Sequence, residues 1–469
     1  MAGLVDRSTY LSSVETTDGR QWPTAQAMTE STHFVNRHGG TRKKQATRYG
    51  LHGMHEYRGK FNPQMARALI NIADPSATQF LDPFCGSGTA LVEGARLGLS
   101  VSGIDSSPMA HFIARTKVTF ACASEPAPLF ERFTALRALV RDSLKEGQDG
   151  TAHPCPHWMS PAADSYLREW FTAPAISSLY AGLARMSRPG EDAVSDLVAV
   201  AISSIVRSVS LQLPEDLRVR RRPPGFVAPS LADAFDSAAD RIEAGFEEML
   251  TWPMSGVDHV VLRGSCSDEN LVGSLGADEG RRLVVTSPPY ATALPYIDTD
   301  RLSLVLLGLA SPKELRHQEA ALVGSREWGQ VEARRWSDLR SQNALGLPGS
   351  VVDLLSEISS RNELHGAGFR RAAVPALLYR YFADMAACLR AWTSYLRPSE
   401  RAVLVVGRNR TGRSGDQVLI DTPRLLADVA QDCGYQLDEI VPFETWPRYG
   451  LHGANGVRGE DAIFLTRAG

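Results

Sequence analysis

The feature that most constrains the fold of this chain is a short apolar run that ends at an acidic residue and a glycine-rich turn. Residues 79–84, QFLDPF, have the length and composition of a buried strand, and residues 90–98, ALVEGARLG, have helical spacing. A second short apolar run, residues 99–105, follows directly. The order strand, glycine turn, helix, strand predicts a βαβ unit and therefore a largely parallel sheet in an α/β fold.

Elements farther along the chain extend this pattern. A helix is expected at 63–73, before the first strand, and the amphipathic segment 376–396 predicts another. We therefore expect a Rossmann-like fold with a mainly parallel sheet that ends in an antiparallel strand pair. The other expected elements are strands at 259–264, 282–290, 401–407, 435–443 and 460–467, and a helix at 422–434.

Shifts in composition divide the chain into six segments. Residues from about 126 to 250 carry repeated helical spacing and predict a helical insertion between the two halves of the sheet. The mixed-charge stretch that follows the second half predicts an irregular lid or loop region. The expected segments are an N-terminal arm (1–50), the first half of the sheet domain (51–120), the helical insertion (121–255), the second half (256–310), the lid or loop region (311–375) and a C-terminal part (376–469).

The turn between the first strand and its helix, DPFCGSGT, carries the first functional motif. Gly86 and Gly88 allow the backbone to approach a ligand closely, and Asp82 offers an acceptor to an ammonium group. Asp105 ends the next strand, where it could accept both hydroxyls of a ribose. The motif is neither GxGxxG nor a P-loop, so the two acids favour a nucleoside that bears an amino acid over a dinucleotide or triphosphate. The alternative is an ordinary tight turn.

The segment TSPPY, residues 286–290, is the second functional motif and follows an apolar run. Pro288 and Pro289 make a rigid, extended turn that lacks backbone N–H donors and leaves carbonyl oxygens free as acceptors. Ser287 adds a hydroxyl and Tyr290 adds a flat aromatic face. This set suits a planar base with an exocyclic amino group, which it would hold by stacking and by accepting both amino hydrogens. The alternative is a simple strand terminator.

The net charge of −3 excludes a global basic field, so a nucleic-acid partner would need a local basic surface. Two clusters qualify. One, between residues 37 and 48, includes Lys43 and Lys44, and the other comprises Arg218, Arg220, Arg221 and Arg222. Each could equally be a solvated loop, the second by pairing with Glu215 and Asp216.

Cysteine spacing and hydropathy bear on metal binding and on the cellular location of the protein. The six cysteines are scattered, without CxxC pairs or Cys/His metal spacing, so we expect no metal and a reducing, cytoplasmic location. The N-terminus lacks the pattern of a signal peptide, and the longest apolar stretch, 197–206, is too short to cross a membrane. The hexapeptide RYGLHG occurs at 48–53 and again at 448–453, and we expect both copies to be surface loops.

Together, DPFCGSGT and TSPPY resemble the motifs of the S-adenosylmethionine-dependent DNA amino-methyltransferases. The resemblance implies that 51–120 forms the cofactor-binding half and 256–310 the catalytic half of a methyltransferase domain. It further implies that Ser287, Pro288, Pro289 and Tyr290 hold a base flipped out of double-stranded DNA. The segment 57–70 resembles the family's segment that closes over the methionine part of the cofactor, and Ser265 is a weaker candidate for this site. The implied cofactor residues are Lys60, Phe61, Pro63, Asp82, Phe84, Gly86, Gly88, Thr89 and Asp105.

Within this family, SPPY accompanies mostly N4 of cytosine, whereas an aspartate in place of the serine accompanies mostly N6 of adenine. Ser287 therefore favours cytosine N4, with adenine N6 as the alternative. Related pockets methylate guanine N2 in RNA or, with Asn-Pro-Pro-Tyr, glutamine amides in proteins, and a non-catalytic scaffold that binds S-adenosylmethionine is a further alternative. The helical insertion is the expected DNA-recognition region. The sequence carries no nuclease signature, so any companion protein in restriction or phage defence would be another chain.

Overall fold

The structure, a computed structural model, describes residues 47–147, 152–214, 216, 220–250, 252, 256–276, 279–291, 296–413, 415–443 and 456–469. An eight-stranded sheet runs through the molecule in the order β3-β2-β1-β4-β5-β8-β7, with β6 paired to β5 outside this path. The first five strands of the order are parallel, and β8 is antiparallel to both β5 and β7. The expected fold class, a Rossmann-like sheet that ends in an antiparallel pair, is confirmed.

The strands begin and end close to the positions that the apolar runs predict, except for β5, which is longer. Strand β1 spans Gln79–Asp82 and is fully buried, because helices cover both faces of the sheet. The other strands are β2 (Ser100–Asp105), β3 (His259–Arg263), β4 (Arg282–Thr286), β5 (Arg401–Arg413), β6 (Asp416–Ile420), β7 (Tyr435–Phe443) and β8 (Gly456–Arg467).

Two hydrophobic cores lie on opposite faces of the sheet. Successive strand residues alternate between them, as Phe80 in the first core and Leu81 in the second illustrate. Helices α3 (Pro63–Ala73), α4 (Thr89–Arg96) and α5 (Pro108–Ala121) cover the first face. Helices α11 (Glu269–Gly273), α17 (Val374–Trp392) and α18 (Thr422–Asp432), with the 3-10 turn η4 (Ser274–Gly276), lie on the second side.

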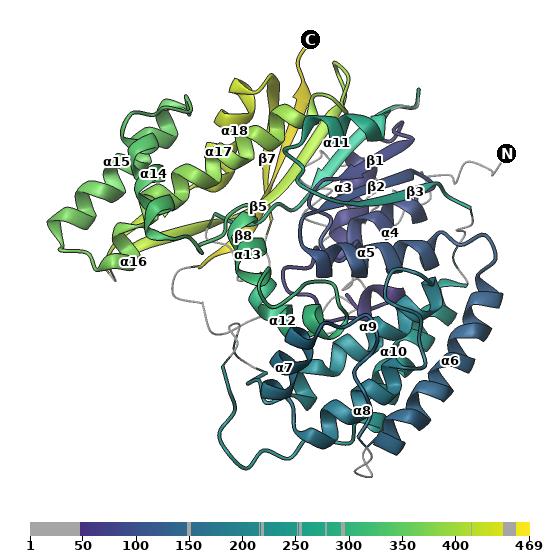
Figure 1. Ribbon diagram of the computed structural model, residues 1–469. Helices are drawn as coiled ribbons and strands as arrows, with labels where there is room; N and C mark the ends of the chain where they lie inside the picture. The colour runs from purple at the N-terminus through teal and green to yellow at the C-terminus, as the bar shows by residue number, and fades with distance from the viewer. Residues whose placement is uncertain are drawn as a thin grey trace, which may run out of the picture.

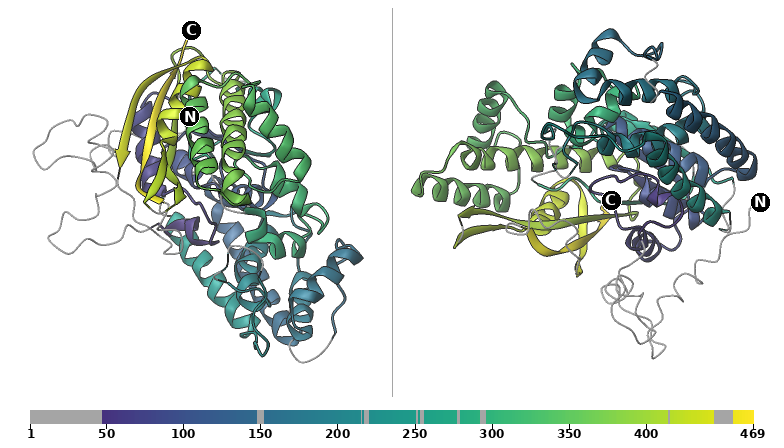
Figure 2. Two further views of the ribbon diagram at one scale, coloured as in Figure 1. Left: turned by 90° about the vertical axis from the view of Figure 1, so that its left-hand side faces the viewer. Right: turned by 90° about the horizontal axis from the view of Figure 1, so that it is seen from below.

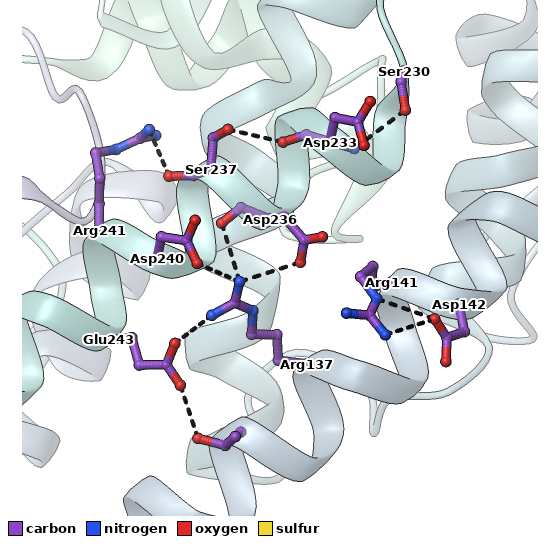
Figure 3. A network of polar contacts seen from close by, with 11 residues as sticks. Arg137, Arg141, Asp142, Ser230, Asp233, Asp236, Ser237, Asp240, Arg241 and Glu243 are labelled. Carbon is purple, nitrogen blue, oxygen red and sulfur yellow. Dashed lines mark hydrogen bonds and ion pairs between the residues drawn. The ribbon is translucent and has the colours of Figure 1, made fainter.

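The predicted helical insertion forms a layer of helices below the sheet in the view of Figure 1. Its helices α9 and α10 pack against each other, and α9 also contacts α5 of the sheet domain. Arg137 links α6 to α10, because its guanidinium contacts the carboxylates of Asp236, Asp240 and Glu243 on α10 (Figure 3). The helices are α6 (Pro126–Glu146), α7 (Pro161–Trp170), α8 (Ala173–Leu183), α9 (Ala193–Val209) and α10 (Leu231–Met249).

The expectation of an irregular stretch at 311–375 is wrong, because most of this segment is helical. After α12 (Tyr296–Leu306), the chain forms α13 (Leu315–Ala321), α14 (Gln330–Ser341), α15 (Gly349–Leu364) and α16 (Phe369–Ala372). Helix α14 buries none of its residues, so it has no apolar face that sequence periodicity could reveal. Helices α14 to α16 project to one side of the sheet beside the extended β5–β6 hairpin (Figures 1 and 2).

The first copy of RYGLHG is also not a surface loop. It includes the 3-10 turn η2 (Gly50–Gly53), which is buried against α10. Tyr49 Oη donates to Glu93 Oε1 at 2.9 Å, and His52 Nε2 contacts the same oxygen at 2.9 Å. The expected arm therefore ends before Tyr49, and the second copy lies outside the described residues. No helix among the described residues is long and apolar enough to cross a membrane.

Candidate active site

The glycine turn leads from β1 into α4 at the carboxyl edge of the sheet. Gly86 and Gly88 have φ values of 49° and 73°, a left-handed conformation that glycine adopts without steric cost. A Cβ atom on Gly88 would lie 3.0 Å from Ala114 Cα, so this glycine also allows α4 and α5 to approach closely. The two glycines thus place no side chain between the backbone of the turn and a ligand bound beside it.

Asp82 is buried at the end of β1. Its Oδ1 accepts hydrogen bonds from Thr286 Oγ1 at 2.6 Å and from Phe84 N at 3.2 Å. Burial raises the pKa of Asp82 to about 7, although both hydrogen bonds oppose the shift. No described residue donates to Oδ2 of Asp82, so that oxygen is an acceptor available to a cationic ligand.

Asp105 ends β2 and closes the turn from the other side. Its Oδ2 accepts from Gly86 N at 2.9 Å and its Oδ1 accepts from Ser107 N at 2.8 Å. Burial raises the pKa of Asp105 to about 6, against the effect of these two backbone donors. Each oxygen keeps a further lone pair, so the carboxylate fixes the turn and can still accept hydroxyls.

The segment before α3 covers the glycine turn. Tyr57 lies over Gly86, where a Cβ atom would come within 3.3 Å of its ring, and stacks on Tyr296 at 6.5 Å between centroids. Lys60 Nζ donates to the carbonyl oxygens of Thr47, at 2.8 Å, and His52. Pro63 is the first residue of α3, which Asn62 caps.

A cavity brings the two motifs and the covering segment together. It contains most of the predicted cofactor residues and, from the second motif, Ser287. Pro63, Gly88, Asp105 and Ser265 are not among its lining residues, nor are the predicted catalytic residues Pro288, Pro289 and Tyr290. Ser265 lies exposed beside Ser267. The lining residues are Gly59, Lys60, Phe61, Asp82, Phe84, Cys85, Gly86, Ser87, Thr89 and Ser287.

The TSPPY segment follows β4 directly. Ser287 and Pro289 are half-buried, and Pro288 is buried. The Tyr290 hydroxyl donates to Glu460 Oε1 on β8, and a Cβ atom on Gly407 of β5 would lie 3.5 Å from the Tyr290 ring. Burial and the Glu460 carboxylate raise the pKa of Tyr290 well above its ordinary value, so the phenol stays protonated.

Several residues of this site have no individual signal in the sequence. Ser87 and Cys85 lie inside the DPFCGSGT motif, but nothing in the sequence marks them individually. Tyr57 is the first residue of the covering segment 57–70. Thr286 and Glu460 contribute through contacts with Asp82 and Tyr290 that only the folded chain reveals. The order of the strands in the sheet brings these pairs together, and periodicity does not encode that order.

The predicted basic residues are largely engaged within the protein. Arg220 pairs with Asp216 at 3.1 Å, and Arg221 donates to Glu169 O at 2.7 Å. Arg222 donates to the carbonyl oxygens of Ser210, Arg207 and Ser208 near the end of α9. Arg218, Lys43 and Lys44 lie outside the described residues. No group of three or more His, Cys, Asp or Glu residues in the described part of the chain could hold a metal ion.

Comparisons with known proteins find similarity to methyltransferases. Residues 54–135 match the family model UPF0020, an RMKL-like methyltransferase domain. The chain is 26% identical over 283 residues to the type II methyltransferase M.MvaI of Kocuria varians, which covers 56% of this chain and 59% of that protein. It is 38% identical over 76 residues to the type II methyltransferase M.MjaII of Methanocaldococcus jannaschii, or 16% of this chain and 14% of that protein.

The name of a third relative describes an enzyme that acts on RNA. The tRNA (guanine(10)-N2)-dimethyltransferase of Methanothermobacter thermautotrophicus is 40% identical over 50 residues, or 10% of this chain and 15% of that protein. The chain thus spans less than two thirds of the length of each of these relatives.

Proposed function

We propose that this chain is an S-adenosylmethionine-dependent amino-methyltransferase that methylates an exocyclic amino group of a base in DNA, with N4 of cytosine as the target. The observation that carries the proposal is that Ser287 lines the same cavity as Asp82, Gly86 and Lys60. The first residue of the base-holding motif therefore lies beside the cofactor motif, which supports the close approach that direct methyl transfer requires.

The donors and acceptors around the cavity suit those of S-adenosylmethionine. Thr89 Oγ1 is buried without a hydrogen-bond partner among the described residues, which indicates that a ligand completes the site. Asp82 Oδ2 suits the ammonium group of the cofactor, and the Asp105 carboxylate beside the turn suits its ribose hydroxyls. When bound, the cofactor supplies an electrophilic methyl group.

The protein's own residues would orient the amino group of the base. A base inside a duplex cannot reach this cavity, so it must be extruded from the stack. The Ser287 hydroxyl and the backbone carbonyl oxygens beside Pro288 would accept the two amino hydrogens, which turns the nitrogen lone pair toward the methyl group. The bond between Tyr290 and Glu460 would fix the orientation of the aromatic ring. No strong base is needed in this scheme.

Two relatives named as type II methyltransferases support DNA as the substrate, and Ser287 favours cytosine over adenine by its resemblance to the SPPY group. The proposal includes a restriction or phage-defence protein, encoded by another chain, as the partner of this one. RNA guanine N2 is the second candidate, because the tRNA methyltransferase matches 50 residues of this chain.

The test offers labelled S-adenosylmethionine with genomic DNA or with total RNA, followed by digestion and mass analysis of the nucleosides. We expect N4-methylcytosine in DNA, at least about 100-fold less of it with Ser287→Ala because an oriented acceptor is lost, and wild-type yield with Ser237→Ala. Ser237 is a matched control because its hydroxyl donates only within α10. N6-methyladenine would correct the target, and label confined to RNA would refute DNA as the substrate.

A further inference from the structure

Lys117 is a buried amine that the scheme above does not use. It lies on α5, and only 1% of it is exposed. Its Nζ has one hydrogen-bond partner among the described residues, Ser87 Oγ at 3.5 Å. An unpaired charge at such a position is costly, by several kcal/mol for a buried ion, so a structural role alone does not account for it.

The groups that face Lys117 do not neutralise it. Lys60 lies nearby with the same charge, and the buried His52 and His55 have pKa values lowered to about 4, so they are neutral. Cys85 also faces Lys117, and burial raises the pKa of its thiol well above the ordinary value. Burial, followed by Lys60, lowers the pKa of Lys117 well below its ordinary value.

Ser87 connects Lys117 to the cavity. Its hydroxyl accepts from Lys117 and belongs to the cavity lining, together with Lys60. A hydroxyl that accepts one hydrogen bond can donate its own proton to a second acceptor. An anionic group in this part of the cavity would therefore receive a hydrogen bond from Ser87 and supply the counter-charge that Lys117 lacks.

We propose that Lys117 and Ser87 form a carboxylate subsite for the methionine end of S-adenosylmethionine, and that Lys117 takes up a proton when this carboxylate binds. The inference rests on the cofactor use proposed above. Lys117 acts through Ser87, so it is a positioning residue.

Isothermal titration calorimetry at pH 7.5, in buffers of different ionisation enthalpy, tests the subsite. The probes are S-adenosylhomocysteine and methylthioadenosine, which lacks the amino acid carboxylate. We expect Lys117→Met to take up fewer protons with S-adenosylhomocysteine than the wild type, and to bind it about 10- to 100-fold more weakly because a charge-assisted contact is lost. Its affinity for methylthioadenosine should not change.

Equal losses for both ligands would show a structural role and overturn the proposal. If Lys117→Met does not fold, Ser87→Ala replaces it and should weaken only S-adenosylhomocysteine. Wild-type protein that binds S-adenosylhomocysteine with no more proton uptake than methylthioadenosine would also refute the subsite. Wild-type protein that binds neither ligand would instead refute the proposed function.

A second, independent observation concerns the outer lobe, defined as residues 361–371 and 408–416. Asp416 on the β5–β6 hairpin holds it together by contacting Arg361 and, at 2.6 Å, His365 Nε2. The two segments carry six arginines and two acids, Glu363 and Asp416. Arg361 and Arg408 also pair with Glu357, Asp421 and Asp461 outside the two segments, so the excess positive charge of the lobe comes from its other four arginines.

Exposed apolar side chains accompany these arginines. Phe369 is 81% exposed and Leu364 is 79% exposed. Arg370 and Arg410 are exposed and form no ion pair or side-chain hydrogen bond with any described residue, in contrast to Arg220 and Arg222. Exposed guanidinium groups bind phosphates, and exposed aromatic rings stack on or wedge between bases, in proteins that bind nucleic acids.

The lobe also lies at a suitable distance from the catalytic loop. Strand β5 leads from Gly407, which packs under Tyr290, to Arg413 in the lobe. Six residues of extended chain span about 20 Å, or roughly six base pairs of a duplex with a helical turn of about 34–36 Å. A duplex with one base in the catalytic pocket would therefore reach the lobe.

We infer that the outer lobe contacts the DNA beside the flipped base, with Arg370 and Arg410 on phosphates and Phe369 against a base step. The inference rests on the proposed function. Fluorescence anisotropy of a labelled duplex, titrated at several salt concentrations, tests it.

Arg370→Ser with Arg410→Ser should weaken DNA binding and reduce the slope of log K against log salt by about 0.9 per lost phosphate contact. Phe369→Ala should weaken binding without changing the slope. Arg241→Ser is the control, since this arginine donates within α10. Unchanged affinity and slope in the lobe variants, with losses in Arg220→Ala and Arg221→Ala instead, would move the DNA surface to the insertion. A wild type without DNA affinity would refute the proposed function itself.

Discussion

The pH dependence of nucleoside binding should report the ionisation of Asp105. Its carboxylate is the proposed acceptor for the ribose hydroxyls, and burial raises its pKa to about 6. A raised pKa means that the protonated, poorly accepting form is populated on acidification, so affinity is full above about pH 7 and falls below about pH 6. At pH 5 about one molecule in ten keeps the carboxylate, which predicts a loss of about tenfold, or about 1.4 kcal/mol.

Methylthioadenosine is the probe for this measurement, because it lacks the amino acid part that Asp82 and Lys117 would bind. Its dissociation constant, measured by calorimetry from pH 8 to pH 5, should rise about tenfold in the wild type. In Asp105→Asn, affinity should be weaker at pH 8 and independent of pH. Asp353→Asn, an exposed carboxylate on α15, should behave like the wild type. A flat wild-type profile, or an unchanged profile in Asp105→Asn, would refute the ribose assignment.

Three further predictions concern activity and stability. Tyr290→Ala should abolish methyl transfer in an activity assay but retain affinity for S-adenosylhomocysteine in calorimetry. If activity and affinity are both lost, Tyr290 does not belong to the base pocket. Glu93→Gln should lower the urea midpoint by the equivalent of about 2–4 kcal/mol, because it weakens the contacts of the buried Glu93 carboxylate with the buried His52 and the partly exposed Arg67, and an unchanged midpoint would disprove that role. The pKa of Asp82 is about 7, above its ordinary 3.8, so ionising this carboxyl removes stability as pH rises toward 7. Asp82→Asn should therefore stabilise the ligand-free protein at pH 8 by up to about 4 kcal/mol and have little effect at pH 4, which thermal unfolding at both pH values will check.

The sequence predicts well those elements whose local signals agree with their burial. The helix expected at 63–73 occurs with these bounds, because Asn62 caps it, Pro63 suits its first turn and its apolar face is buried. The face expected for 376–396 is likewise buried, from Leu378 to Leu396. In both segments, periodicity and tertiary packing favour the same structure, and in the first the Asn62 cap does so as well.

Elements without an apolar face could not be predicted in this way. Strand β5 continues to Arg413, beyond the expected end at Gly407, because the polar residues of its second half pair with β6. Helix α14 has no such face either, whereas α15 buries Val351, Leu355 and Ile358 at helical spacing, a signal that the expectation of an irregular stretch overlooked. A buried polar residue gives an equally weak signal, since Lys117 in the sequence resembles any lysine on a helix.

The site shows a similar division. Motifs identify Asp82, Gly86 and Ser287, which the structure brings to one cavity. Partners such as Glu460 for Tyr290 come from strands about 170 residues away in sequence, and the strand order that joins them has no local sequence signal.

The central claim is that one cavity holds S-adenosylmethionine with its reactive end toward Ser287. A crystal structure of the protein with S-adenosylhomocysteine tests this directly. We predict ribose hydroxyls within hydrogen-bond distance of the Asp105 carboxylate, the ammonium group at Asp82, and the sulfur atom facing the loop from Ser287 to Tyr290. A ligand bound elsewhere, or with its sulfur separated from that loop by packed side chains, would contradict the account.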